Sequence, residues 1–133
     1  GILPKGSESI MLVDDEESIR DFNQSFLEEC GYSVSTYENG FDAFEVFEPN
    51  PEKYDLIITD MAMPRMNGRE FASKVLKIRS DIPIIFCTGY SEDFSEDQAL
   101  KMGITHYMQK PIDVKRMCRI IREILDSKDQ SKK

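Results

Sequence analysis

Several residue types and patterns are scarce in this chain of 133 residues, and each scarcity excludes a class of protein. The three cysteines, Cys30, Cys87 and Cys118, are an odd number, lie far apart and form no C-x-x-C pair. They argue against a disulfide framework or a zinc site and fit a reducing cytoplasm. The single histidine, His106, leaves little for a histidine-based metal site.

Long apolar segments are also missing from the sequence. No stretch reaches the roughly 18 consecutive apolar residues that a membrane-spanning helix needs. No basic segment followed by an apolar run indicates a signal peptide. The chain begins with Gly1 rather than Met, so we expect an excised fragment or a chain with a tag remnant.

Positive charge is in short supply as well. The chain has 17 Lys and Arg against 25 Asp and Glu, which gives a net charge of −8. Nucleic-acid binding needs clustered positive charge, so we expect no nucleic-acid partner. The same acidity argues against binding to an anionic membrane surface. With 40% hydrophobic and 32% charged residues, the composition is that of a globular protein.

The organisation along the chain indicates one folded domain between two linkers. Residues 1–8 are rich in Gly, Pro and Ser and show no periodicity, which is typical of a linker. Residues 126–133 carry five charges and nothing apolar, so we expect a charged flexible tail. Residues 9–125 form the predicted domain.

Within this domain, short β-rich runs alternate with segments of helical periodicity. The predicted strands are 9–13, 32–36, 55–59, 82–87 and 104–108, and the predicted helices are 19–30, 41–47, 71–78, 99–102 and 114–125. Five strands and five helices in strict alternation predict an α/β fold, a doubly wound parallel sheet with helices on both faces. The run at 32–36 alternates between polar and apolar residues, as an edge strand does.

Polar residues stand where the predicted strands end. Asp14 and Asp15 follow the first strand, Asp60 the third and Thr88 the fourth, while Lys110 follows the fifth. The carboxyl ends of parallel strands meet at one edge of the sheet, where such folds bind their ligands. We therefore expect three carboxylates, a hydroxyl and an ammonium group to lie together.

This combination predicts phosphoryl chemistry. Three neighbouring carboxylates repel one another, and Mg²⁺, which prefers carboxylates, waters and phosphate oxygens, relieves the repulsion. Lys110 and Thr88 supply a fixed charge and a neutral donor for phosphoryl oxygens. Asp60 stands alone at the end of a central strand and is the candidate nucleophile, because aspartate can form an acyl phosphate.

These residues resemble the response-regulator receiver domains of two-component signalling. The resemblance covers about residues 9–125, and the matching positions are Asp14, Asp15, Asp60, Met63, Pro64, Asn67, Gly68, Thr88, Tyr107, Lys110 and Pro111. It implies a flavodoxin-like (βα)5 fold with strand order 2-1-3-4-5. It also implies that Asp60 accepts a phosphoryl group from a histidine kinase or a phosphotransfer protein.

The resemblance implies further roles at the site. Asp15 and Asp60 would bind Mg²⁺ directly, Asp14 through water, and the backbone carbonyl of Ala62 would complete the protein ligands. Thr88 and Lys110 would contact the phosphoryl group. Tyr107 would be the aromatic switch that moves inward as Thr88 turns toward the phosphate. The peptide bond between Lys110 and Pro111 would be cis.

Two positions at which the family varies, the second residue after the phosphoacceptor and the second after the threonine, are Ala62 and Tyr90 here. Ala62 has no side chain to orient an attacking water, and Tyr90 could shield the phosphoryl group, so we expect slow autodephosphorylation. Aspartyl phosphatases commonly carry a second Asp at the position of Ala62, which argues against that alternative. A second alternative is a pseudo-receiver that acts only as a binding module, and the complete set of site residues argues against it.

The output of the domain is left open by the sequence. The linker before residue 9 resembles the one that joins a kinase core to the C-terminal receiver of a hybrid sensor histidine kinase. That parent would be an enzyme, whereas a receiver domain has no turnover on external substrates. Basic residues of the last helix, Lys115, Arg119 and Arg122, could face acidic residues Glu92, Asp93, Glu96 and Asp97 of a second copy in a homodimer.

Overall fold

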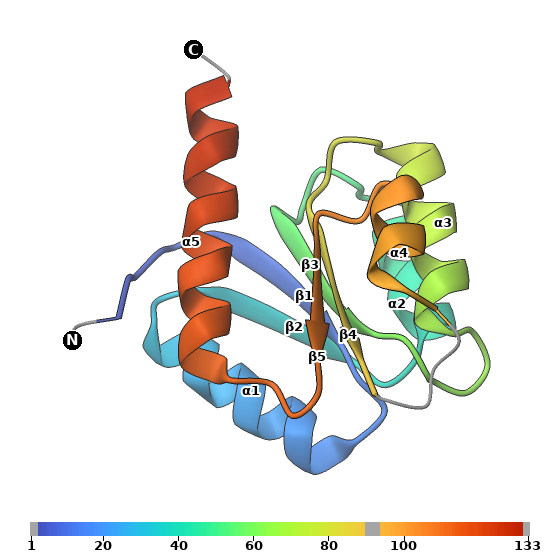
Figure 1. Cartoon of the computed structure of the whole chain (residues 1–133), viewed down its shortest axis with the longest axis horizontal. Helices are drawn as coiled ribbons and strands as arrows, with labels where there is room; N and C mark the ends of the chain where they lie inside the picture. The colour runs from blue at the N-terminus through green and yellow to red at the C-terminus, as the bar shows by residue number, and fades with distance from the viewer. Residues whose placement is uncertain (1–2, 90–93, 132–133) are drawn as a thin grey trace.

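The computed structural model describes residues 3–89 and 94–131 and contains one parallel sheet of five strands between two helical layers (Figure 1). The elements in chain order are β1 (Ser9–Val13), α1 (Glu17–Glu29), β2 (Ser33–Tyr37), α2 (Gly40–Phe47), β3 (Leu56–Asp60), α3 (Gly68–Ile78), β4 (Ile84–Thr88), α4 (Glu96–Lys101), β5 (His106–Gln109) and α5 (Val114–Ser131). The strand order is β2-β1-β3-β4-β5. The predicted fold class and strand order are confirmed.

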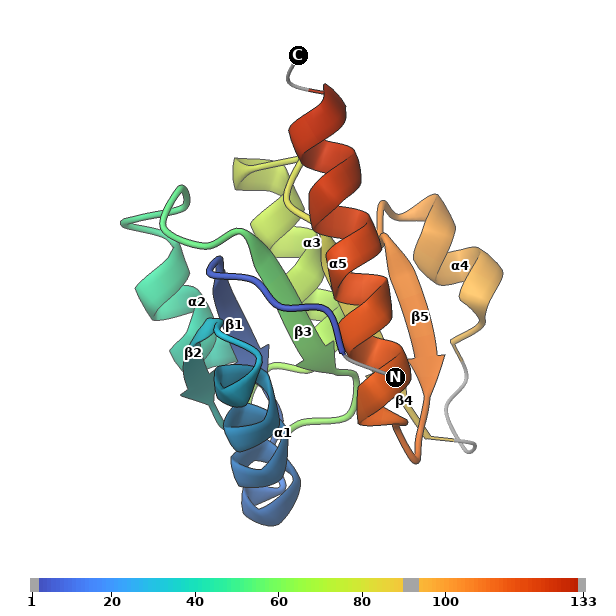
Figure 2. The same ribbon diagram turned by 90° about the vertical axis from the view of Figure 1, so that its left-hand side faces the viewer.

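The helices cover both faces of the sheet. Helices α1 and α5 lie on one face, and α2, α3 and α4 lie on the other, as the two perpendicular views show (Figures 1 and 2). The three inner strands β1, β3 and β4 are almost wholly buried, whereas β2 at the edge is half-exposed. This is why the inner strands are largely apolar and the edge strand alternates.

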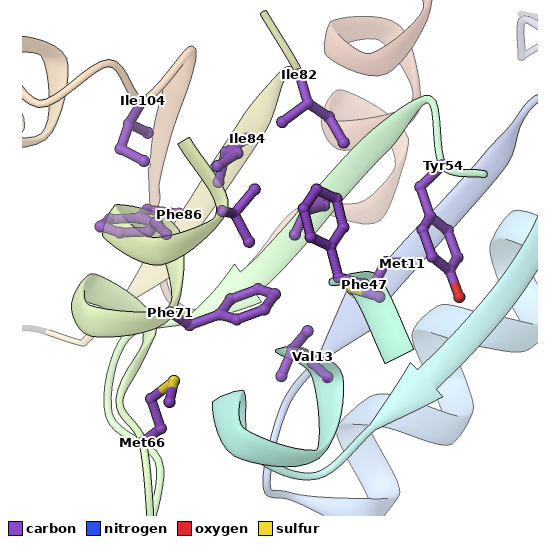
Figure 3. Close-up of a cluster of buried hydrophobic side chains, with 14 of the residues drawn as sticks. Met11, Val13, Phe47, Tyr54, Met66, Phe71, Ile82, Ile84, Phe86 and Ile104 are labelled. Carbon is purple, nitrogen blue, oxygen red and sulfur yellow. The ribbon is translucent and has the colours of Figure 1, made fainter. Parts of the chain in front are cut away.

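Two apolar clusters fill the space between the sheet and its helices. The cluster under α2, α3 and α4 includes the aromatic side chains of Phe47, Phe71 and Phe86, which lie among aliphatic side chains in this layer (Figure 3). The cluster under α1 and α5 is more aliphatic and includes Leu27, Ile58 and all three cysteines. Each helix is therefore held by burial of its apolar stripe.

Two strands, β4 and β5, begin two residues later than their apolar runs suggested. The predicted strand at 82–87 begins at Ile84 in the structure, because Pro83 has no N–H to donate; its carbonyl accepts the N–H of Ile57 at 3.0 Å. The predicted strand at 104–108 begins at His106, since the N–H of Ile104 donates to Ala99 at the end of α4.

The starts of α2, α3 and α4 are fixed by side-chain caps that short-range patterns can reveal. Asn39 caps α2 and Asn67 caps α3. Helix α4 begins with a capping box in which Ser95 and Gln98 bond reciprocally to each other's backbone N–H. The predicted helix at 99–102 missed this first turn, although the Ser-x-x-Gln signal is present in the sequence.

The two ends of the chain differ from the linkers that were expected. Residues 3–8 lie against the domain, where the N–H of Gly6 donates to Cys30 and the carbonyl of Glu8 accepts from Ser33. Helix α5 continues through residues 126–131 and projects past the sheet (Figure 1). Among the described residues, no helix is both long and apolar enough to cross a membrane.

Candidate functional site at the carboxyl edge of the sheet

The predicted site residues come together at the carboxyl edge of the sheet. Asp14 directly follows β1, Asp60 and Thr88 are the last residues of β3 and β4, and Lys110 directly follows β5. Parallel register places these strand ends side by side, with Asp60 opposite Cys87 and Thr88 opposite Gln109. The topology therefore assembles the site from four separate strands.

The three carboxylates form one group. Ligand oxygens of Asp14, Asp15 and Asp60 all lie within 4.8 Å of one another. Asp14 and Asp60 are buried, whereas Asp15 is exposed. The amine of Lys110 reaches into this group, with Nζ 3.1 Å from Asp60 Oδ2 and 3.7 Å from Asp14 Oδ2. One ammonium group thus faces two buried carboxylates.

Backbone groups hold the two buried carboxylates in place. The N–H of Glu16 donates to Asp14 Oδ1 at 2.9 Å, and the N–H of Met61 donates to Asp60 Oδ1 at 2.8 Å. Each carboxylate therefore keeps its second oxygen, Oδ2, turned toward Lys110. This arrangement fixes the direction in which Oδ2 of Asp60 points.

Two further residues support the loops around the site, and the sequence reasoning did not explain them. Arg20 of α1 donates from Nη1 to the backbone carbonyl of Asp14 at 2.7 Å. Gly68 lies so close to the backbone of Asp60 and Met61 that a Cβ at this position would collide with the carbonyl of Asp60. The Asn-Gly pair in the sequence draws attention to Gly68 as a turn residue. Nothing in the sequence distinguishes Arg20 from other arginines on helices.

Burial dominates the electrostatics of the site. It raises the pKa of Asp60 from 3.8 to about 6, although the hydrogen bond and charge of Lys110 act in the opposite direction. Burial also raises the pKa of Asp14. For Lys110, burial disfavours the charged form, but the two carboxylates outweigh it and raise its pKa. The acidic group is therefore short of positive charge, even with Lys110 in place.

Thr88 and Tyr107 lie on the neighbouring strands β4 and β5. The side-chain oxygen of Thr88 is fully buried and has no hydrogen-bond partner among residues 3–89 and 94–131. A buried hydroxyl without a partner is costly, so Oγ1 has an unmet hydrogen-bonding capacity within the described part of the chain. Tyr107 is half-buried, and its hydroxyl donates to the carbonyl of Phe94 at 2.9 Å.

The remaining predicted residues flank this centre. Ala62 lies in the loop after β3 and is exposed, and the Lys110–Pro111 peptide bond is cis. Tyr90, which we expected to shield a phosphoryl group, lies outside the described residues, as do Glu92 and Asp93.

An apolar pocket of about 560 Å³, not foreseen from the sequence, opens beside Lys110. Its walls come from Ile19 and Phe22 of α1 and from Gly89, Pro111 and Ile112 around the ends of β4 and β5. Phe22 is 58% exposed although it is large and apolar. In the sequence, Phe22 is an aromatic residue at helical spacing on the first helix. Such spacing by itself predicts a core residue, so it does not reveal that Phe22 lines a pocket.

The donor set fits a hard divalent cation. Three carboxylates within one small group, two of them buried and lacking enough positive charge, form the oxygen-rich environment that Mg²⁺ prefers. Asp15 is exposed, which leaves room for water ligands on that side. No histidine or thiol belongs to the group, so the set does not suit zinc or copper.

Comparisons with known sequences agree with this geometry. The profile described as response regulator receiver domain matches residues 10–122. The chain is 34% identical over 119 residues to the alkaline phosphatase synthesis transcriptional regulatory protein PhoP of Bacillus subtilis (strain 168), covering 90% of the chain and 49% of that protein. It is 29% identical over 124 residues to the sensor kinase CckA of Brucella abortus (strain 2308), covering 93% of the chain and 13% of that protein. The chain thus spans half or less of the length of these relatives.

Solved structures show the same fold over nearly the whole chain. A response regulator receiver domain protein from Clostridium thermocellum aligns with a TM-score of 0.87 at 27% identity, covering 92% of this chain and 98% of that one. A CheY-like receiver domain protein from Methanospirillum hungatei JF-1 aligns with a TM-score of 0.86 at 28% identity, covering 95% and 99%.

Proposed function

This chain belongs to the family of response regulator receiver domains, and from that premise we propose that it is a phosphoacceptor switch whose acceptor is Asp60. One observation carries the proposal. Asp60 Oδ2 lies 3.1 Å from Lys110 Nζ in a buried acidic group, beside a buried Thr88 hydroxyl that has no partner in the described chain. A phosphoryl group on Asp60 would offer an oxygen to the Thr88 hydroxyl and further oxygens to Lys110.

The reaction is a transfer of a phosphoryl group between two acceptors. An oxygen of the ionised Asp60 carboxylate attacks phosphorus and forms an O–P bond, while the bond from phosphorus to a histidine nitrogen of the donor breaks. The bonding electron pair leaves with that nitrogen. Lys110 stabilises the phosphoryl oxygens because its ammonium group is already held at the site. Reaction requires Asp60 to be ionised, and Lys110 promotes that state.

We propose Mg²⁺ as the cofactor, held by Asp14, Asp15 and Asp60 with the backbone carbonyl of Ala62 as a further ligand. When bound, the ion neutralises carboxylate charge and stabilises negative charge on phosphoryl oxygens. Asp14 is oriented for this role by the N–H of Glu16, and its loop is held by Arg20.

Phosphorylation would be read out through Thr88 and Tyr107. In the structure the Thr88 hydroxyl is unpaired among the described residues, and the Tyr107 ring is only half-buried and tied to the carbonyl of Phe94. A phosphoryl oxygen would give Thr88 a partner and bias it toward Asp60. The space released beside β5 would favour an inward position of Tyr107 and so change the surface around α4 and β5.

The direct test uses the protein with Mg²⁺ and acetyl phosphate, followed by intact-mass measurement. We expect a gain of one phosphoryl group, and we expect Asp60→Asn to abolish it. Asp81→Asn is the matched control, because Asp81 is an exposed carboxylate away from the site. Circular dichroism verifies that both variants are folded. No mass gain in the wild-type chain, or an equal gain in Asp60→Asn, would overturn the proposal.

The donor would be a histidine kinase or a phosphotransfer protein in the cytoplasm. The pocket beside Lys110 offers an apolar docking surface next to the acceptor, with Phe22 exposed at its wall. Phe22→Ala should therefore slow transfer from a phosphohistidine protein and leave phosphorylation by acetyl phosphate unchanged. An equal effect on both donors would show that Phe22 acts on the site itself and not on docking.

A homodimer through α4 and α5 is a separate proposal, and one predicted contact needs correction. Arg122 is bonded within its own chain to Glu8 and Asp126, so it does not face outward as the sequence pattern suggested. Lys115 and Arg119 are exposed and remain available to Glu96 and Asp97 of a second copy. Sedimentation with and without phosphorylation measures this association.

Slow loss of the phosphoryl group is the last part of the proposed function. Ala62 is exposed beside the acceptor and has no polar side chain that could orient an attacking water. We expect Ala62→Asn to shorten the lifetime of the phosphorylated state, measured by intact mass after removal of the donor. An unchanged lifetime in both Ala62→Asn and Tyr90→Ala would contradict this expectation.

A further inference from the structure

Two cysteines that are distant in the sequence meet in the apolar layer under α1 and α5. The sulfur atoms of Cys30 and Cys118 lie 3.5 Å apart, although the residues are separated by 88 positions. Both side chains are buried, and both are free thiols. The third cysteine, Cys87, is also buried in this layer, but no sulfur contact joins it to either of them in the described structure.

The backbone around each thiol is anchored, so their proximity is built into the fold. Cys30 ends α1, where its N–H donates to the carbonyls of Phe26 and Leu27 and its own carbonyl accepts from Gly6. Cys118 lies in the second turn of the 18-residue helix α5. Neither residue can move far without breaking a helix or detaching the segment at 3–8.

We propose that Cys30 and Cys118 form an oxidation site, at which a peroxide converts the two thiols into a disulfide between the end of α1 and α5. A disulfide has a sulfur–sulfur distance of about 2.05 Å, so the two sulfurs must approach by less than the diameter of one atom. The inference is independent of phosphorylation, because neither cysteine belongs to the site at the carboxyl edge.

The chemistry balances with hydrogen peroxide as the oxidant. One thiol, as its thiolate, attacks a peroxide oxygen and becomes a sulfenic acid, and the proton and hydroxide released form water. The second thiol attacks the sulfenic sulfur, the S–S bond forms, and a second water leaves. In total, two thiols lose two protons and two electrons, and one peroxide is reduced to two waters.

The surroundings of the pair indicate the order and the rate of these steps. Cys30 is 6% exposed and Cys118 is fully buried, so the oxidant should reach Cys30 first and Cys118 should resolve the sulfenic acid. Burial raises the pKa of Cys118 to about 12, with the neighbouring Cys30 thiol adding to the shift. Oxidation should therefore be slow and should depend on brief local opening of the layer.

The cross-link would enclose the chain from β2 to β5 in a single loop. Closing a loop of 88 residues restricts the unfolded chain strongly, so the oxidised protein should melt about 10 °C higher than the reduced protein. This shift gives a readout that simple oxidation of a single thiol would not produce.

The experiment treats the full chain with hydrogen peroxide, removes the oxidant, unfolds the protein and alkylates the remaining thiols. We expect intact mass to show one alkylated cysteine where the reduced protein shows three. Peptide mapping without reduction should give one cross-linked pair that contains Cys30 and Cys118, and dithiothreitol should reverse both the mass change and the melting shift.

Variants separate this bond from other oxidation. Cys87→Ala is the matched control, since it removes a buried thiol of the same layer, and it should form the disulfide as the wild-type chain does. Cys30→Ala and Cys118→Ala should retain both of their remaining thiols. If either variant fails to fold, the peptide map of the wild-type chain decides. Three alkylated cysteines, separate sulfinic acids at the two positions, or a bond that includes Cys87 would overturn the proposal.

Discussion

Two carboxylates of this domain each face a cationic side chain, yet their pKa values move in opposite directions. Glu8 lies against Arg122, with contacts of 2.7 and 3.0 Å, and its pKa falls from 4.5 to about 2 because the guanidinium group donates two hydrogen bonds. Asp60 lies 3.1 Å from Lys110, and burial raises its pKa to about 6.

The difference follows from how each pair is built. Arg122 donates two hydrogen bonds to the carboxylate of Glu8, the partly exposed last residue of the segment at 3–8. The charged form of Glu8 is therefore stabilised. Lys110 must serve both Asp60 and Asp14, and both are buried. The first pair is a structural contact. In the second, two buried carboxylates share one ammonium group, an imbalance that is typical of functional sites.

The largest expected effect concerns Lys110, the cationic partner of Asp60. Lys110→Ala should slow phosphorylation by acetyl phosphate about 100-fold, because removing a fixed donor at a transferring group costs about that much. The measurement is the initial rate of phosphoryl incorporation by intact mass. Lys115→Ala, which removes an exposed lysine of α5, should leave the rate unchanged. A rate reduced less than tenfold in Lys110→Ala would remove Lys110 from the phosphoryl site.

The second prediction concerns the dependence of stability on pH. Asp60 and Glu8 should change the stability in opposite directions as the pH rises. The folded-state pKa of Asp60, about 6, lies above its ordinary value of 3.8, so the folded chain binds more protons than the unfolded chain between these values. The contribution of Asp60 to stability is therefore present at low pH and is lost as the pH rises through about 6. In metal-free buffer, Asp60→Asn should be about 2 kcal/mol more stable than the wild-type chain at neutral pH.

Glu8 should behave in the reverse manner. Its folded-state pKa of about 2 lies below its ordinary value of 4.5, so its contribution is present above 4.5 and is lost as the pH falls toward 2. Glu8→Gln should lose about 2 kcal/mol at neutral pH and flatten the acid limb of the stability profile. Urea unfolding at a series of pH values measures both variants, and two profiles of the same sign would contradict the comparison.

The third prediction tests the structural pair alone. Arg122→Ala should lower the free energy of unfolding by about 2 kcal/mol at neutral pH, since it removes the partner of Glu8 and the contact to Tyr32. Arg122→Lys should recover only part of this loss, because lysine has no planar fork. Arg119→Ala is the exposed control, and phosphorylation rates should be unchanged in all three. A large effect of Arg122→Ala on the phosphorylation rate would show that the pair of Arg122 and Glu8 influences the site around Asp60.

The smallest expected effect concerns metal. At about ten times its dissociation constant, Mg²⁺ should stabilise the wild-type chain by about 1.4 kcal/mol, because it binds the folded state alone. Asp15→Asn should remove most of this gain, whereas Glu17→Gln, an exposed change at the start of α1, should keep it. Thermal unfolding with and without MgCl₂ measures the difference. An equal gain in Asp15→Asn would exclude that carboxylate as a ligand.

The sequence by itself determined the fold class, the strand order through the family resemblance, and the residues that gather at the carboxyl edge. Apolar runs and helical periodicity are short-range signals, and in a parallel sheet every strand end lies at the same edge. Asp14, Asp60, Thr88 and Lys110 could therefore be placed together without coordinates. The predicted roles of these residues remain predictions until phosphorylation is measured.

Only the tertiary structure decided in which direction the pKa of each carboxyl group is shifted and which distant residues are in contact. The pKa of Asp60 depends on how deeply the strand end is buried, and no local pattern records that depth. The contact between Cys30 and Cys118, and the pairing of Arg122 with Glu8, join positions far apart in the chain. Both contacts arise because α5 packs against the end of α1 and against the segment at 3–8, and no local pattern in the sequence records that packing.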